Sequence, residues 1–223
     1  MVLKARSKTI DMTEAVIFDF DGVIGDTMKD NCMAWKKAFK NYGFEMSEKE
    51  YYLLEGMGRF QIAEHFIEKY KLKGIEKTEV AALKEELYKK DNQFRIYDHV
   101  FEIFDLLERK KISTAIVTGA SRVRISEHLD PKIAKQLDAL ITADDVVNTK
   151  PHPEPYLNAV KKLGKKAENC IVVENAILGL QSAIAAGCRT YALETTLNKE
   201  DLVLAEEVFS NHKDLLTKFE NQL

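Results

Sequence analysis

Two aspartates near the start of the chain have the type and spacing to do chemistry. Asp19 and Asp21 directly follow the apolar run Ala15–Phe18, within the segment DFDGVIGDT. Carboxylates at the end of a buried strand are costly unless a cation or a substrate pairs with them. They offer a carboxylate nucleophile beside a carboxyl acid/base, with Mg²⁺ between protein and phosphate. The alternative, that Asp and Gly only build a turn, is disfavoured by the D-x-D-G pattern after the strand and by the following Asp26-Thr27.

Two later segments could hold a phosphate group. Thr118 ends an apolar run and precedes Gly119, so that a hydroxyl and free backbone amides come before a helix. An ordinary helix N-cap is the alternative for Thr118. Lys150 opens the segment KPHPEPY, where three of the four prolines in the chain follow within five residues. Because proline stiffens the backbone, Lys150 suits a fixed positive charge against phosphate, whereas His152 is expected to be exposed or packed in the loop.

Short apolar runs rich in β-branched residues recur along the chain and would position these side chains. Such runs predict strands buried on both faces. The predicted strands cover residues 15–18, 114–117, 139–141, 171–173, 189–193 and 207–209, the last two on weaker patterns. Between them, apolar residues recur at helical spacing around 100–107 and 177–184. This alternation predicts an α/β fold with a parallel sheet, in which ligands bind beyond the carboxyl ends of the strands.

One long interval breaks this alternation. Residues 28–94 contain no convincing strand and only amphipathic helical patterns, punctuated by glycines. The helical patterns are carried by Met33, Ala34, Lys37 and Ala38, by Phe66, Ile67 and Tyr70, and by Val80, Leu83 and Leu87. A helical block of this size, inserted directly after the first strand, predicts a second small domain.

The segment DFDGVIGDT closely resembles the first motif of the haloacid dehalogenase-like (HAD) hydrolase superfamily, in the branch with a helical cap inserted after that motif. The resemblance covers nearly the whole chain. It implies a Rossmann-like parallel-sheet α/β core, residues 1–26 and 96–223, with an inserted helical-bundle cap domain, residues 27–95. Family dehalogenases lack the second aspartate, so Asp21 favours phosphate chemistry over carbon–halogen cleavage.

The same resemblance implies roles for individual residues. Asp19 would attack phosphorus and Asp21 would be the acid/base, while Thr118 and Lys150 match the second and third motifs. Thr118, Lys150 and loop amides such as that of Gly119 would then hold the phosphoryl oxygens. Catalysis of this kind is mostly positioning and charge stabilisation.

The fourth motif is where the chain departs from the family. That motif ends a strand in two acidic residues that hold Mg²⁺, and the chain has Glu174-Asn175 there. The implied metal ligands are Asp19, the Asp21 backbone carbonyl and this pair. An Asn carbonyl oxygen ligates magnesium without charge, so weaker metal binding is expected. Alternatively, Glu174 is the principal ligand and Asn175 caps the following helix.

The helical insert would close over the site and select the leaving group. From it, Asn31 and Trp35 could face the cleft, and Gly56-Met57-Gly58-Arg59 resembles the substrate-specificity loop of the family. Arg59 would suit an anionic or hydroxylated substrate. The alternatives are that Trp35 belongs to the core of the insert and that Arg59 is a solvated helix start.

These inferences predict a Mg²⁺-dependent phosphatase of a small phosphorylated metabolite, a sugar phosphate or a phosphoglycolate-like compound, acting through an aspartyl-phosphate. A β-phosphoglucomutase-like mutase is one alternative. Mutase relatives carry histidine where Asn31 stands, and Asn cannot shuttle protons as imidazole does. A phosphate-binding protein that has lost turnover through Asn175 is the other alternative, although Asp19, Asp21, Thr118 and Lys150 are all in place.

Composition excludes several other classes. The 223 residues carry 33 Lys and Arg against 36 Asp and Glu, a net charge of −3, so a nucleic-acid partner is not expected. The uncharged stretch 175–188 is too short and too polar to span a bilayer, and residues 1–12 lack the apolar stretch of a signal peptide. Three cysteines without C-x-x-C spacing fit free thiols in a reducing cytoplasm. A cytoplasmic monomer or homodimer is therefore expected, with no membrane partner.

Overall fold

The computed structural model describes residues 13–223; the sequence-based expectation about residues 1–12 concerns a segment outside that range. Within it, six strands form one sheet in the order β3-β2-β1-β4-β5-β6, and every neighbouring pair is parallel. The strands are β1 (Ala15–Phe18), β2 (Ser113–Val117), β3 (Ala139–Ile141), β4 (Cys170–Glu174), β5 (Arg189–Leu193) and β6 (Glu207–Phe209). The predicted α/β fold with a parallel sheet is confirmed.

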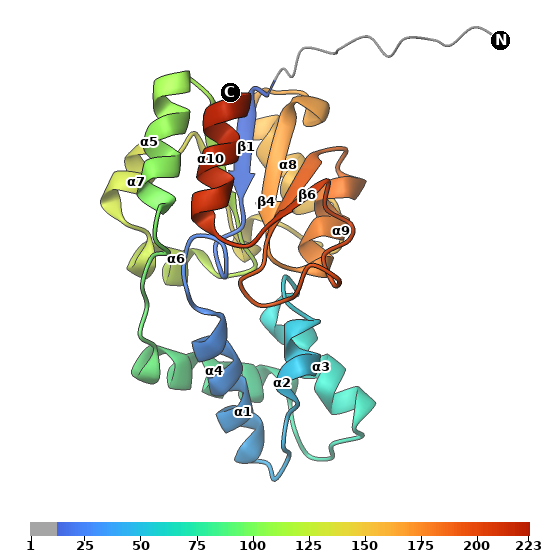
Figure 1. Cartoon of the computed structure of the whole chain (residues 1–223). Coiled ribbons are helices and arrows are strands. Elements are labelled where there is room, and N and C mark those ends of the chain that lie inside the picture. The colour runs from blue at the N-terminus through green and yellow to red at the C-terminus, as the bar shows by residue number, and fades with distance from the viewer. Residues whose placement is uncertain (1–12) are drawn as a thin grey trace, which may run out of the picture.

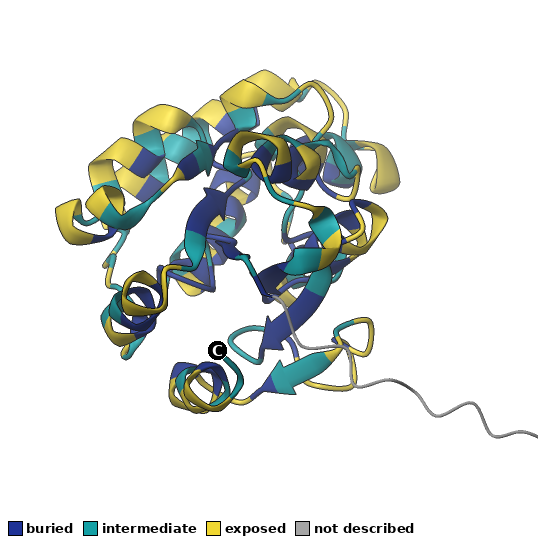
Figure 2. Ribbon diagram, turned by 90° about the horizontal axis from the view of Figure 1, so that it is seen from above, coloured by how far each residue is buried: buried dark blue, intermediate teal, exposed yellow. Residues whose placement is uncertain are grey.

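Helices cover both faces of this sheet (Figure 1). They are α5 (Val100–Lys110), α6 (Arg122–His128), α7 (Pro131–Gln136), α8 (Glu154–Leu163), α9 (Ile177–Ala185) and α10 (His212–Gln222), with short 3₁₀ turns η1 (Ala143–Asp145) and η2 (Ala167–Asn169). Seen from above, the central strands are buried, the edge strand β6 is partly exposed, and the outward faces of the helices are exposed (Figure 2). Parallel sheets need this cover because each strand buries both of its faces.

The central strand β1 shows how the sheet is fixed. Val16 and Phe18 point to the face covered by α5 and α10, and Ala15 and Ile17 to the face covered by α8 and α9. All four side chains are at most 2% exposed. Burying such side chains contributes on the order of 1.5–3 kcal/mol for each large one. This packing holds the end of β1, and with it Asp19, in one place.

Between β1 and α5 the chain forms a separate helical unit of α1 (Met28–Lys40), α2 (Glu48–Tyr52), α3 (Arg59–Lys69) and α4 (Lys77–Asp91). The unit has its own apolar core, in which Trp35, Phe39 and Phe66 are fully buried. It lies beyond the sheet edge toward which β1 runs (Figure 1). The expected run of helices without strands is therefore what the structure contains, whereas the boundaries 27 and 95 stay a prediction.

The buried faces of some helices differ from the expected ones. Met33 and Tyr70, assigned to apolar stripes, are 39% and 42% exposed, and Ile184 of α9 is 44% exposed. In α1 the stripe is rotated toward Trp35 and Phe39, because these large side chains fill the core of the helical unit. The two segments joining this unit to the sheet run side by side, with Asp26 N–H donating to the Arg95 carbonyl at 2.9 Å.

Within the described residues, no helix has the length and apolar character required to cross a membrane.

Candidate active site

Three buried charged residues meet below the carboxyl ends of β1 and β4. The Lys150 ammonium lies 2.6 Å from Asp19 Oδ1 and 2.6 Å from Glu174 Oε1. Lys150 and Glu174 are 2% and 1% exposed, and the Lys150–Pro151 peptide bond is cis. Glu174 is held further by the Tyr156 hydroxyl at 2.6 Å and by the Asn175 N–H at 3.1 Å. The ammonium thus joins two acidic strand ends that are 155 residues apart in sequence.

Burial sets the electrostatics of this group. Desolvation raises the pKa of Asp19 to about 7, although the nearby Lys150 acts in the opposite direction. Burial alone would lower the pKa of Lys150, but the charges of Asp19 and Glu174 outweigh it and raise that pKa above its ordinary value. Lys150 therefore remains a fixed cation, and it favours the ionised form of Asp19 that nucleophilic attack requires.

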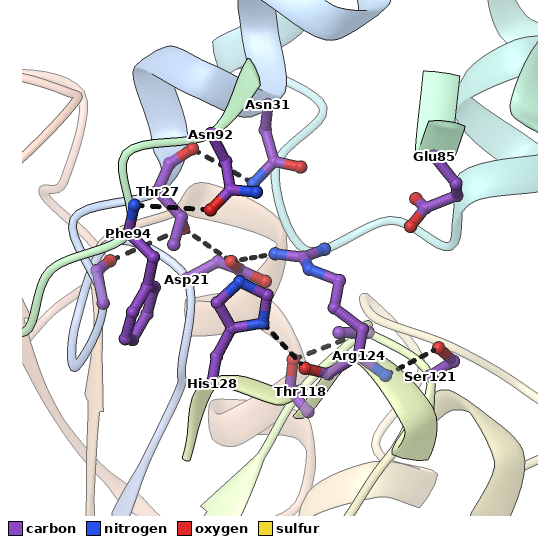
Figure 3. Close-up of polar contacts among 12 residues, drawn as sticks. Asp21, Thr27, Asn31, Glu85, Asn92, Phe94, Thr118, Ser121, Arg124 and His128 are labelled. Carbon is purple, nitrogen blue, oxygen red and sulfur yellow. Dashed lines mark hydrogen bonds and ion pairs between the residues drawn. The ribbon is translucent and has the colours of Figure 1, made fainter. Parts of the chain in front are cut away.

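A second ion pair holds Asp21 (Figure 3). The Thr27 hydroxyl donates to Asp21 Oδ1 at 2.5 Å, and the Arg124 guanidinium binds the same oxygen. Arg124 reaches in from the first turn of α6 and lies over the Tyr88 ring at 4.7 Å. Sequence reasoning missed Arg124. The segment TGASRVR was visible, but only the phase of α6 shows that Arg124 faces Asp21 while Arg122 pairs with Asp145.

Thr118 and Gly119 lie at the end of β2 beside this pair. The Thr118 hydroxyl is buried and accepts from the Ala120 N–H at 3.0 Å. The N-cap of α6 is Ser121, so the N-cap alternative for Thr118 is wrong. A Cβ on Gly119 would lie 3.6 Å from the Gly56 carbonyl oxygen, which shows how closely the helical unit approaches this loop.

A cavity of about 70 Å³ lies between the helical unit and the sheet. A volume of that order holds several water molecules or one phosphate-sized group. Its lining includes, of the predicted site residues, Asp19, Asp21, Asn31, Arg59, Gly119 and Asn175, together with Trp35. Thr118, Lys150 and Glu174 are buried. The structure therefore places six of the nine predicted site residues on the wall of one cavity.

The helical unit places its side chains on this wall in different ways. Asn31 is tied to its surroundings, since its Nδ2 donates to the Thr27 carbonyl at 3.1 Å and its Oδ1 accepts from Lys84 at 2.6 Å. Trp35 is part of the helical core and also lines the cavity. The two alternatives for Trp35, a core residue and a residue facing the cleft, therefore both apply. Arg59 begins α3 and is half-buried on the wall.

Lys84 of α4 is a cation that sequence reasoning missed. It is 3% exposed, and burial, reinforced by the charge of Arg124, lowers its pKa to about 8. Its ammonium contacts Glu85 at 3.0 Å as well as Asn31. A lysine with this pKa is partly deprotonated under mildly alkaline conditions, so the charge of the cavity wall changes in that range.

Asn175 does not cap the helix that follows it. The N-cap of α9 is Ala176, and the capping prediction is wrong because the Asn175 side chain turns toward the helical unit instead. Its Nδ2 donates to Glu55 Oε2 at 2.8 Å and to Thr196 Oγ1 at 3.0 Å. Glu55 also went unnoticed in the sequence. Burial chiefly, with the carboxylates of Asp19 and Glu174, raises its pKa well above the ordinary value.

The oxygen atoms at the strand ends fit a magnesium ion in type. In residues 13–223 no three His, Cys, Asp or Glu side chains are grouped to hold a metal. Mg²⁺ does not need such a cage, since it is commonly bound by one or two carboxylates with water and phosphate oxygens. Asp19, the Asp21 carbonyl, Glu174 and Asn175 supply only oxygen donors, and Glu55 Oε1 is a buried oxygen without a hydrogen-bond partner beside them.

Comparisons with known proteins point in one direction. A family model described as haloacid dehalogenase-like hydrolase matches residues 16–193. An uncharacterized protein of Haemophilus influenzae is 31% identical over 185 residues, which is 82% of this chain and 92% of that protein. A phosphorylated carbohydrates phosphatase of Thermotoga maritima is 26% identical over 215 residues, covering 91% of this chain and all of that protein (100%). The crystal structure of beta-phosphoglucomutase from Clostridium difficile is similar at a TM-score of 0.78 and 26% identity, covering 94% of this chain and 98% of that one.

Proposed function

The chain belongs to the haloacid dehalogenase-like hydrolase family, and on that basis we propose that it is a Mg²⁺-dependent phosphatase of a small phosphorylated metabolite. Its relatives include phosphatases and a phosphomutase, and the predicted enzyme class, a HAD-like phosphomonoester hydrolase, is confirmed. One observation carries the finer proposal. The nucleophile candidate Asp19 is joined to a buried ammonium at 2.6 Å and shares a small cavity with a second carboxylate, Asp21.

In the proposed reaction Asp19 attacks phosphorus. Its carboxylate oxygen forms a bond to phosphorus while the bond to the leaving alkoxide breaks, and Asp21 gives the alkoxide oxygen a proton. Water then attacks the aspartyl-phosphate and passes its proton to Asp21. The bond between Asp19 and phosphorus breaks, which releases inorganic phosphate and restores both carboxyl groups.

The other residues hold the phosphoryl group. Lys150 stabilises the developing charge, because its position is fixed by two carboxylates and by burial. Thr118 and the Gly119 amide lie directly after β2 and suit the remaining phosphoryl oxygens. Mg²⁺, held by Asp19, the Asp21 carbonyl, Glu174 and Asn175, would neutralise phosphoryl oxygens when bound.

The helical unit, residues 27–95, is proposed to act as a cap over the site. Asn31 and Arg59 stand on the cavity wall, where a leaving group would contact them. The cavity lies between the helical unit and the sheet, so movement of the helical unit would control substrate entry. Sugar phosphates and phosphoglycolate-like compounds remain the proposed substrate class, in a cytoplasmic monomer or homodimer.

The test measures inorganic phosphate released from a panel of phosphosugars, phosphoglycolate and an aryl phosphate. Each compound is assayed with Mg²⁺, with EDTA, and with the variants Asp19→Asn and Asp201→Asn. Asp201 is an exposed aspartate outside the cavity lining and is the matched control. Release that requires Mg²⁺ and is lost only in Asp19→Asn is expected. Equal release by both variants would refute the assignment of Asp19.

One arm of the same assay addresses a mutase. Adding a hexose bisphosphate to a hexose monophosphate and following isomer formation separates phosphoryl transfer to sugar from transfer to water. Because Asn31 is held by Lys84 and the Thr27 carbonyl and has no proton to shuttle, phosphate release is expected to exceed isomer formation.

A further inference from the structure

Glu55 is a buried carboxylate that links the helical unit to the sheet. It stands between α2 and α3 and is 3% exposed. Its Oε2 accepts hydrogen bonds from Asn175 Nδ2 at 2.8 Å and from Thr196 Oγ1 at 3.0 Å, both on the sheet side. Its Oε1 is buried and has no hydrogen-bond partner. Burying an ionisable oxygen without a partner is costly, so this atom indicates a place for a positively charged ligand.

The charges around Glu55 are out of balance. Glu55 shares the cavity wall with Asp19, and burial, with the nearby carboxylates of Asp19 and Glu174, raises the pKa of Glu55. Asp21 is neutralised by Arg124, and Glu85 by Lys84. Among the ion pairs of the described residues, the Lys150 ammonium contacts Asp19 and Glu174, and none includes Glu55. A divalent cation beside Glu55 Oε1 would give this carboxylate the positive partner that it lacks.

We propose that Glu55 is part of the metal site and supplies from the helical unit the negative charge that Asn175 lacks. The inference rests on the proposed Mg²⁺ site at the ends of β1 and β4. In this arrangement one carboxylate has moved from the strand end to the cap loop, and Glu55 Oε1 is the atom that faces the cation.

The amide at position 175 is what allows this exchange. A carboxylate there would set two anionic oxygens near the 2.8 Å that now separates Asn175 Nδ2 from Glu55 Oε2. The Asn175 amide donates instead, and its Oδ1 is left outside the hydrogen bonds to Glu55 and Thr196. Because Glu55 comes from the helical unit, binding of the cation would also hold that unit closed against the sheet.

The experiment measures cation binding without any turnover. Free Mn²⁺ is followed by electron paramagnetic resonance during titration of the full chain, and Mg²⁺ is added as the competitor. Glu55→Gln, which keeps the shape and removes the charge, is expected to weaken Mn²⁺ binding by about tenfold or more. Glu85→Gln removes another acid from the same cavity wall, one already paired with Lys84, and is expected to bind Mn²⁺ as the native chain does.

A charge-exchange variant tests the pairing itself. Glu55→Gln combined with Asn175→Asp returns the acid to the strand end, and Mn²⁺ affinity should recover to within about threefold of the native chain. The same double variant decides the matter if Glu55→Gln alone fails to fold. The single tryptophan, Trp35, lies on the cavity wall, so its fluorescence should respond to Mn²⁺ in the native chain and not in Glu55→Gln.

The outcomes separate the two proposals. If Glu55→Gln binds Mn²⁺ as tightly as the native chain while Asp19→Asn does not bind it, the metal site stands and the role of Glu55 is overturned. If Glu55→Gln changes only the KM for a hydroxylated substrate, Glu55 contacts the leaving group and the inference is again wrong. Absence of Mn²⁺ binding by the native chain would overturn the metal site and this inference with it.

Discussion

Replacing Lys150 by methionine should destabilise the chain strongly. Lys150 is 2% exposed and its ammonium lies 2.6 Å from both Asp19 and Glu174. Methionine keeps the length of the side chain but leaves two carboxylates buried without a cation. Removing one partner of a buried ion pair costs on the order of 3–5 kcal/mol. For a chain of this size that corresponds to a fall in Tm of roughly 10 °C.

The loss should depend on pH in a defined direction. The pKa of Asp19 is already raised from 3.8 to about 7, chiefly by burial, and loss of the ammonium can only raise it further. A carboxyl whose folded-state pKa lies above its unfolded value binds protons more tightly in the folded state. Protonation therefore favours folding as the pH falls from about 7 toward 4, and the deficit of Lys150→Met should be smaller at pH 5.5 than at pH 8.

Urea unfolding followed by circular dichroism at pH 8 and pH 5.5 measures both effects. Lys161→Met, an exposed lysine of α8, is the control and should change the free energy of unfolding by less than about 0.5 kcal/mol. Adding Glu174→Gln to Lys150→Met should restore part of the loss, since one unpaired carboxylate is removed. A Lys150→Met protein as stable as the native chain at pH 8 would show that Asp19 and Glu174 do not depend on the ammonium.

Three further perturbations follow from the packing and the pKa values. Gly179→Ala would place a Cβ 1.9 Å from Glu174 Oε1, so it should displace Glu174 and lower phosphate release at least about tenfold, as a steady-state assay would show. Lys84 has a pKa lowered to about 8, so kcat/KM for a substrate with an anionic leaving group should fall as the pH rises through 8; the same profile should be flat in Lys84→Met. The buried thiols have pKa values raised by burial to about 11 or 12, so a disulfide reagent at neutral pH should modify them only after unfolding; immediate modification of the native chain would contradict their burial. They are Cys32, Cys170 and Cys188.

The sheet was predictable from sequence because strands buried on both faces must be apolar along their whole length. AVIF, STAIV and CIVVE stand out against a chain with 31% charged residues. The polar residues that follow these runs then lie at one edge, since all neighbouring strands are parallel. Asp19, Thr118 and Glu174 were found in this way. The position of Lys150 followed from its motif, and its contact with Glu174 required the folded chain.

The helical unit was harder to predict because helical periodicity does not fix which face is buried. In α4 the pattern of Val80, Leu83 and Leu87 suggested one stripe, but the buried residues are Val80, Ala81, Lys84 and Tyr88. Lys84 is buried because it meets Asn31 and Glu85 and lies over the rings of Trp35 and Tyr88. Lys84 lies four residues from both Val80 and Tyr88, which places it on their buried face of the helix. That spacing alone does not predict burial, because most lysines on such helices are solvated.

Asp21, the acid/base candidate, is held by two contacts that a bound substrate would change. Thr27 and Arg124 both bind Oδ1 of Asp21, which leaves Oδ2 outside these two contacts. Arg124 also lines the cavity, where an anionic substrate would compete with Asp21 for its guanidinium. A substrate that draws Arg124 toward itself would loosen the ion pair that now holds Asp21. Binding of the anion would thus leave the Asp21 carboxyl group freer to reach the leaving-group oxygen, so a substrate would itself help to place the acid/base residue.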